Sequence, residues 1–295
     1  MKARAWRALA RLDKPGPDGE GNAALASDEL LEALKLTPET PSDTLLAADL
    51  AEASGQLDAA ESAYRRVLAA DPKSIPANSG LAHVLIKRKQ YPEAEKLIRA
   101  ALQQEPDDPV LNAQLATVLA AQDDADAVPL LKKLHAAHPG DPAISRMLAE
   151  VLAESGDPVA SDALYTALLA KSPDDIDLLI AHGQNLVRQQ HFSQALDVFN
   201  KAASLDSASG DAWSGVAFAA SKLHQPSIVI HALTIRARFL PDGPATYFLW
   251  ATSYDTLNDK AAAITYYHHF LDSAAGKFPD QEWQARQRLL VLEKK

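Results

Sequence analysis

Apolar residues recur at helical spacing along most of this chain, and short polar stretches interrupt them at regular places. The segment 176–207 shows this most clearly. Its second half places Ala195, Phe199 and Ala202 four and three residues apart, so these side chains share one face of a helix. A polar turn, residues 189–194, separates this helix from an equally apolar stretch before it. The segment therefore predicts two amphipathic helices joined by a turn.

The same helix-turn-helix pattern recurs upstream and downstream at an interval of about 34 residues. Proline marks the interval at Pro38, Pro72, Pro106, Pro139, Pro173 and Pro241, and Ser207 stands where one proline is missing. Proline cannot donate a backbone hydrogen bond and restricts the residue before it, so it ends a helix. A period of this length is typical of repeat arrays.

At three further positions of each repeat, side chains of similar size recur. The first holds a small residue, at Ala10, Ala48, Ala82, Ala116, Ala149, Gly183, Ala217 and Ala251. The second is also almost always small, at Ala26, Ala60, Ala94, Ala127, Ser161, Ala195, Val229 and Ala263. Four residues later a larger side chain follows, at Leu30, Tyr64, Ile98, Leu131, Tyr165, Phe199, Leu233 and Tyr267. Small residues let two helices approach closely, and the larger one fills the space beside them.

This order of small, small, large and proline positions resembles the tetratricopeptide repeat (TPR), a helix-turn-helix unit of 34 residues. Trp213 with Ala217, and Trp6 with Ala10, match the aromatic start of the family pattern. The resemblance implies an all-α fold, a right-handed superhelical solenoid of antiparallel helix-turn-helix repeats.

The phase of the repeats predicts three segments. Residues 1–40 form an atypical first repeat with an extended turn at 14–21, and residues 41–277 form seven consecutive repeats. Residues 278–295 form a C-terminal capping helix, because the last unit of a solenoid needs a polar outer face. We expect this helix to begin at Gln281, with apolar contacts from Trp283, Leu289, Leu290 and Leu292. No comparable cap precedes the first repeat, so a trimmed precursor and a fragment stay open alternatives.

Charge and composition narrow the function. The chain has 39 acidic and 29 basic residues, a formal net charge of −10, which disfavours nonspecific binding to nucleic acid or anionic lipid. It has no cysteine, which excludes disulfides, thiolate nucleophiles and Cys-ligated zinc. No apolar run is long enough to span a membrane. Residues 1–12 are basic, as at the start of a signal peptide, but no apolar stretch follows, so a basic first helix is favoured. We expect a soluble protein of the cytoplasm, or of an exported compartment such as the periplasm if a signal peptide was trimmed.

The pattern favours no catalytic, metal or cofactor site. His182 lies at a core position of its repeat, where a structural histidine is more common than a ligand. His268 and His269 are adjacent on a helix and point in different directions, so they cannot share a metal ion as an i, i+4 pair can. The motif Gly16-x-x-Gly19-x-Gly21 follows no strand, so we do not interpret it as a phosphate loop.

The resemblance implies that the first helix of each repeat lines a concave groove. The positions that point into this groove hold aromatic and charged residues, as expected for a peptide or protein site. They are His83, Lys87, Arg146, Glu150, Gln184, Arg188, Phe218, Lys222, Phe248, Thr252 and Asp255. The Lys and Asn pair with which one subtype of the family clamps chaperone tails is missing, since Arg146 and Glu150 stand at one such pair of positions.

The predicted function is a noncatalytic TPR scaffold or adaptor that binds a protein or peptide in this groove. A regulatory or substrate-recruiting module of a larger enzyme or assembly complex is the main alternative. A helical-repeat RNA binder is disfavoured by the acidic excess. The sequence leaves the partner and the oligomeric state open.

Overall fold

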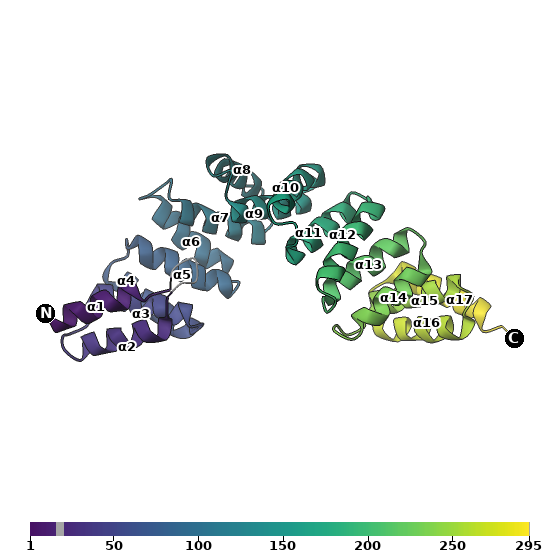
Figure 1. The fold of residues 1–295 in the computed structure, drawn as a ribbon, viewed down its shortest axis with the longest axis horizontal. Coiled ribbons are helices and arrows are strands. Elements are labelled where there is room, and N and C mark those ends of the chain that lie inside the picture. The colour runs from purple at the N-terminus through teal and green to yellow at the C-terminus, as the bar shows by residue number, and fades with distance from the viewer. Residues whose placement is uncertain (16–20, 295) are drawn as a thin grey trace. The chain divides into compact units, whose positions relative to one another are not determined.

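The computed structural model describes residues 1–15 and 21–294. Their regular structure consists of 17 α-helices, with no strand among the described residues, which confirms the all-α expectation (Figure 1). Gly16 and Gly19 of the glycine motif, and most of the expected extended turn at 14–21, lie outside the described residues.

The helices alternate between a first and a second helix of each hairpin, so odd numbers mark first helices up to α15. They are α1 (Lys2–Leu12), α2 (Ala23–Leu34), α3 (Pro41–Ala53), α4 (Leu57–Ala70), α5 (Ile75–Lys87), α6 (Tyr91–Leu102), α7 (Pro109–Ala121), α8 (Ala127–Ala137), α9 (Pro142–Glu154), α10 (Pro158–Lys171), α11 (Ile176–Arg188), α12 (Phe192–Leu205), α13 (Gly210–Lys222), α14 (Pro226–Arg236), α15 (Pro244–Thr256), α16 (Lys260–Ala274) and α17 (Pro279–Leu292).

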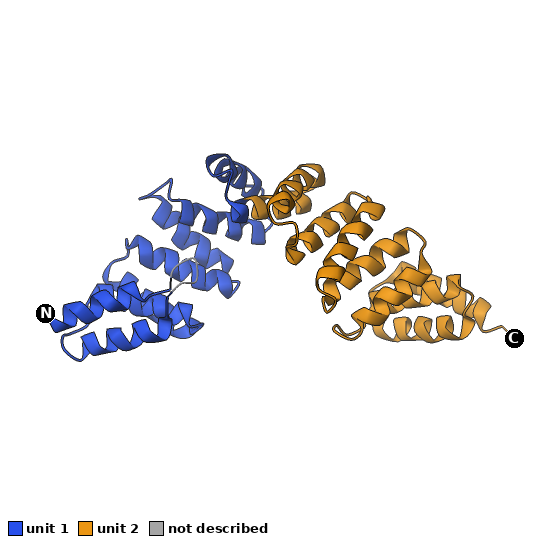
Figure 2. Cartoon of the chain, viewed as in Figure 1, with its two compact units in different colours: residues 1–144 blue, residues 145–295 orange. Residues whose placement is uncertain are grey.

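The chain forms two compact units, residues 1–144 and residues 145–295 (Figure 2). In unit 1, each first helix from α1 to α7 packs on the second helix that follows it, and α2, α4 and α6 each pack on the first helix of the next hairpin. In unit 2, helices from α10 to α17 pack in the same consecutive way. Contacts in both units are therefore within a hairpin or between neighbouring hairpins, as in a stacked repeat array.

The turns inside the seven hairpins from α3–α4 to α15–α16 share one backbone conformation. One residue in each turn is left-handed, with φ between 54° and 92°, at Gly55, Lys89, Asp123, Gly156, Gln190, His224 and Asn258. This conformation ends the first helix and is free of steric cost only for glycine. In five of the seven turns the left-handed residue is not glycine, so its side chain makes this backbone conformation less favourable.

Three of the turns between hairpins are held by a side chain of the following first helix. Asn78 and Asn112 donate from their amides to the carbonyls of Pro72 and Pro106, at 3.3 and 3.0 Å. At the repeat without proline, the Trp213 indole donates to the Ser207 carbonyl at 3.0 Å. The same carbonyl is thus satisfied whether or not proline occupies the position.

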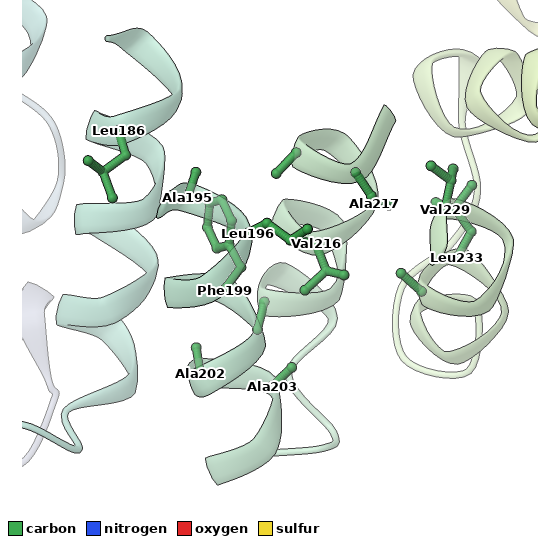
Figure 3. Packing of buried hydrophobic residues seen from close by; sticks show 14 of the residues in the cluster. Leu186, Ala195, Leu196, Phe199, Ala202, Ala203, Val216, Ala217, Val229 and Leu233 are labelled. Carbon is green, nitrogen blue, oxygen red and sulfur yellow. The ribbon is translucent and has the colours of Figure 1, made fainter. Parts of the chain in front are cut away.

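The small and large positions form the core, as expected. All the residues at these three positions are buried. Figure 3 shows Phe199 directed between the helices that carry Leu186 and Val216. A Cβ added at Gly183 or at Gly215 would lie 2.6 or 2.3 Å from the Phe199 ring. Phe199 therefore fills the space that these two glycines leave on α11 and α13.

The C-terminal helix differs from its expected contacts. It begins at Pro279, two residues before Gln281. Leu289 and Leu292 pack against the core of α15 and α16 as expected. Trp283 and Leu290 do not, because their exposed fractions are 65% and 60%. The inward residues of α17 follow a spacing of three and four, and Trp283 and Leu290 each lie one residue, about 100° of helix rotation, away from that face.

Candidate binding face

Within unit 2, the first helix α13 contacts the first helices on either side of it, α11 and α15. We call the surface that these three helices share the first-helix face of unit 2. Side-chain caps fix the start of two of them, since Asp175 accepts from the Leu178 amide and Ser209 from the Ala212 amide. Such caps satisfy amides that have no partner inside the helix, so each helix begins at a defined residue and in a defined register.

A pocket of about 510 Å³ opens on this face. Three of the residues expected in the groove, Gln184, Arg188 and Phe218, line it. Its other lining residues come from all three first helices and from the second helices behind them: Val187, Phe199, Asp211, Ser214, Gly215, Leu233, Arg236, Ala245, Thr246 and Leu249. The pocket is thus apolar at its base, with a few charged and polar groups around it.

Two cations near the pocket have weak internal partners. The Arg188 guanidinium lies 4.0 Å from the Glu154 carboxylate, at the limit of an ion pair. The Lys222 ammonium lies 5.2 Å from the centre of the Phe218 ring, a cation–π contact, and no ion pair is found for it among the described residues. Neither charge is therefore held in a close ion pair among the described residues.

Arg236 is a lining residue that sequence reasoning missed. Its guanidinium donates to the Ser214 hydroxyl at 2.8 Å and to the Pro241 carbonyl at 3.1 Å, and it pairs with Asp242 at 3.2 Å. It lies at the end of a second helix, where the repeat pattern predicts no groove residue. Only the packing of α14 behind α13 brings it to the pocket.

The remaining expected residues of unit 2 lie outside the pocket. Arg146 and Glu150 pair with each other at 3.1 Å. Phe248 is half-buried, with its ring 5.0 Å from that of Phe270. Thr252 donates its hydroxyl to the Phe248 carbonyl at 2.9 Å.

Asp255 is engaged by the capping helix. It accepts two hydrogen bonds from Arg288, at 2.7 and 2.8 Å, and one from the Tyr267 hydroxyl at 3.1 Å. The Arg288 hydrogen bonds are the main cause that lowers the pKa of Asp255, against the opposing effect of burial. This carboxylate therefore holds α17 onto α15.

The expected groove residues of unit 1 share one acidic partner. His83 and Lys87 of α5 contact the Glu52 carboxylate of α3 at 2.5 and 3.0 Å. Burial acts to raise the pKa of Glu52, but the hydrogen bonds and charges of His83 and Lys87 together lower it. The Tyr64 hydroxyl also donates to Glu52 and Asp49, and burial raises its pKa. These groups satisfy one another inside the chain.

Histidine and carboxylate side chains are otherwise dispersed. His182 is half-buried and its Nε2 lies 2.8 Å from the Asp162 carboxylate. No group of three or more such side chains close enough to hold a metal ion occurs in the described parts of the chain. Within the same residues, no helix is both long and apolar enough to cross a membrane.

Models of one known protein family match most of the N-terminal and central parts of this chain. Tetratricopeptide repeat models match residues 19–75, 51–118 and 118–184, which together span more than half of the chain. Cellulose synthase operon protein C of Pseudomonas fluorescens (strain SBW25) is 40% identical over 78 residues. The matched segment is 26% of this chain and 6% of the length of that relative.

Solved structures show the same fold. A tetratricopeptide repeat protein from Parabacteroides merdae has a TM-score of 0.61 at 13% identity, over 87% of this chain and 99% of that one. YrrB, described as a TPR protein with an unusual peptide-binding site, has a TM-score of 0.51 at 21% identity, over 62% of this chain and 95% of that one. With its repeat pattern, its stacked hairpins and these matches, the chain belongs to the tetratricopeptide repeat family.

Proposed function

We propose that this protein is a noncatalytic scaffold or adaptor that binds a protein or peptide on the first-helix face of unit 2. Tetratricopeptide repeats indicate a protein-interaction scaffold. The observation that supports a site on this face is the pocket of about 510 Å³, which three independently expected groove residues line. Its volume lies within the range of about 300–1,000 Å³ that is typical of ligand sites.

We propose a noncatalytic role because several titratable side chains contact one another between helices of the fold. Glu52 contacts His83 and forms an ion pair with Lys87, and Asp255 forms an ion pair with Arg288, so these groups join helices. A catalytic site instead needs a nucleophile, a base and an orienting group around space for a substrate. The groups nearest the pocket, Arg188 and Phe218, are of the kinds that anchor protein interfaces.

Site-specific photo-crosslinking tests the proposal. A crosslinking amino acid at position 218 should capture a partner in cells, whereas one at Lys201 of α12, outside the pocket lining, should not. The captured partner, once purified, should bind a Phe218→Ala/Arg188→Ala double variant at least about tenfold more weakly, since such anchors often contribute more than 2 kcal/mol each. The double variant should keep the circular dichroism and melting temperature of the parent. Unchanged affinity, or capture through position 201 alone, contradicts the proposal.

A second candidate is a regulatory or substrate-recruiting module of a larger enzyme or assembly complex. The observation that favours it is the relative whose name assigns it to a cellulose synthase operon, and of whose length the matched segment is only 6%. Capture of a synthase subunit through position 218, with synthase activity that depends on this chain, would support this candidate. Capture of a partner without enzymatic activity would favour the simple adaptor. An RNA role predicts binding in a nucleic-acid titration at low salt, which the net charge of −10 opposes.

A further inference from the structure

We infer that the pocket of unit 2 receives one bulky apolar side chain of an extended peptide, and that Arg188 and Lys222 bind an acidic residue of that peptide next to it. The inference rests on the proposed function and deepens it, because it assigns a chemical class to the partner. Three features of the first-helix face carry it: the apolar base of the pocket, two cations without strong internal partners, and the distribution of charge along α13.

The base of the pocket is apolar and formed by fixed groups. Val187, Leu233 and Leu249 line it from three helices, and the Phe199 ring lies at its base. A Cβ at Gly215 would lie 2.3 Å from that ring, so the glycine lets Phe199 approach α13 closely. A cavity with such a lining favours an apolar group, since each buried CH₂ contributes about 0.8 kcal/mol. Its volume of about 510 Å³ leaves ample room for the side chain of Leu, Phe or Trp.

The cations beside the pocket differ from other cations on first helices. Lys87 and Arg146 lie 3.0 and 3.1 Å from a carboxylate. Arg188, by contrast, lies 4.0 Å from the Glu154 carboxylate, and the Lys222 ammonium lies over the Phe218 ring, with no ion pair found for it among the described residues. At the C-terminal ends of α11 and α13, the charge without a close internal ion pair is therefore positive, and Arg188 itself lines the pocket. This local charge favours an acidic residue of the partner, although the whole chain is acidic.

The acidic lining residue Asp211 does not cancel this charge. It lies in the first turn of α13, whereas Lys222 is the last residue of the same helix. Eleven residue steps separate these positions, which corresponds to about 16 Å along the helix axis and exceeds the screening length of about 8 Å at physiological salt. Arg188 is likewise the last residue of α11. The acidic residue of the peptide is thus directed to the C-terminal ends of α11 and α13.

Arg188 and Lys222 also have an ordinary structural explanation. A cation in the last turn of a helix interacts favourably with the helix dipole, by about 0.3–1 kcal/mol. That role predicts a change in stability when the charge is reversed, but no change in which peptide binds. The two explanations therefore separate in a specificity experiment.

Peptide display on the full-length purified chain provides the probe. Randomised dodecapeptides should be enriched for Leu, Phe or Trp with Asp or Glu within a few residues. One enriched peptide, made synthetically with a fluorophore, should lose at least tenfold in affinity with an Ala245→Trp variant. Ala245 is an exposed lining residue, so the large side chain fills the mouth of the pocket without entering the core. Ala261→Trp, a matched exposed position on α16, should bind as the parent does.

A charge exchange tests the acidic contact. The Arg188→Glu/Lys222→Glu variant should bind the enriched peptide at least tenfold more weakly, and should regain affinity for the same peptide with its acidic residues replaced by Lys. A purely structural role of the two cations would not produce this recovery.

Three outcomes would overturn the inference. The enriched peptides could show no preference for apolar and acidic residues, or the peptide could bind the Ala245→Trp variant with unchanged affinity. The third outcome is that the Lys-substituted peptide does not regain affinity for the Arg188→Glu/Lys222→Glu variant. Each of these leaves the proposed function standing if a peptide still binds through position 218. Failure to enrich any peptide, together with failure of crosslinking at position 218, would remove both.

Discussion

At the scale of single residues, this fold depends on positions where a side chain has no spare volume. Ala82 of α5 and Ala94 of α6 both have an exposed fraction of 0%. The expected groove residues are instead exposed or half-buried, so their volume is less constrained and their charge and polarity matter more. Substitutions of one kind should therefore change stability, and substitutions of the other kind should change binding.

Overpacking tests the small positions. Replacing Ala82 or Ala94 by Leu should lower the free energy of unfolding by about 1–3 kcal/mol, because the neighbouring helix cannot move away without loss of other contacts. The matched change Ala100→Leu, at an exposed position of α6, should lie within about 0.5 kcal/mol of the parent. Urea unfolding measures both. Equal effects at buried and exposed positions would show that the assigned repeat register is wrong.

The left-handed turn residues allow a second test. Gln190 has φ of +61°, so Gln190→Gly should raise the free energy of unfolding by up to about 1 kcal/mol. Gly55→Ala should lower it, and since a Cβ there would meet nothing within 4 Å, the loss reports on backbone conformation alone. Chemical denaturation of the two variants against the parent gives the signs. Two changes of the same sign would contradict this account of the turns.

At the scale of helices, long-range polar contacts fix how the first hairpin joins the second. Arg7 of α1 donates to both carboxylate oxygens of Asp43 at the start of α3, and to Thr37 between them. Asp43 also accepts from the Thr40 amide in a capping box. One buried carboxylate thus both caps α3 and holds α1.

This contact predicts a pH dependence of stability. Hydrogen bonds from Arg7 lower the pKa of Asp43 to about 2, below its ordinary value of 3.8. A lowered carboxyl pKa stabilises the fold above the unfolded pKa, and this stabilisation is lost as pH falls from about 4 to about 2. The loss should be about 2 kcal/mol, since one pKa unit corresponds to about 1.4 kcal/mol. An Asp43→Asn variant should be less stable at neutral pH and should lack this component of the acid transition, as measured by unfolding between pH 2 and pH 7. An unchanged acid profile would contradict the role of this pair.

At the scale of the whole molecule, stability should divide between neighbouring hairpins because the helices pack consecutively within each unit. The end of unit 2 depends on α17, which covers Tyr267 and Phe270 and pairs with Asp255 through Arg288. The exposed face of α17 still carries Trp283 and Leu290. This helix therefore caps the core beneath it while keeping apolar side chains at the surface.

Removal of residues 279–294 should expose the α15–α16 core and leave Asp255 without its partner. Hydrogen exchange should show faster exchange in α15 and α16, with unit 1 unchanged, because contacts in a repeat array are local. An Arg288→Ala variant should show a smaller effect in the same helices. Equal loss of protection along the whole chain would argue against neighbour-by-neighbour stacking.

Much of the fold could be predicted from local pattern alone. The proline interval, the small residues such as Ala82 and the large residues such as Phe199 report on contacts within a hairpin and with the next one. The candidate site could be predicted only in part. Gln184, Arg188 and Phe218 line the pocket as expected, but the same positional rule selected Asp255, which the capping helix engages.

What the sequence by itself determined was the period, the helices and the residues of the core, because each depends on residue size and spacing over a few tens of residues. The tertiary structure decided which surface groups are free. Glu52 pairs with Lys87 and contacts His83 from another repeat, Arg236 reaches the pocket from a second helix, and Trp283 points outward. These outcomes depend on the rotation of each helix and on the conformations of long side chains. Neither quantity is encoded in a repeat pattern, because many rotations and side-chain conformations satisfy the same sequence of small and large residues.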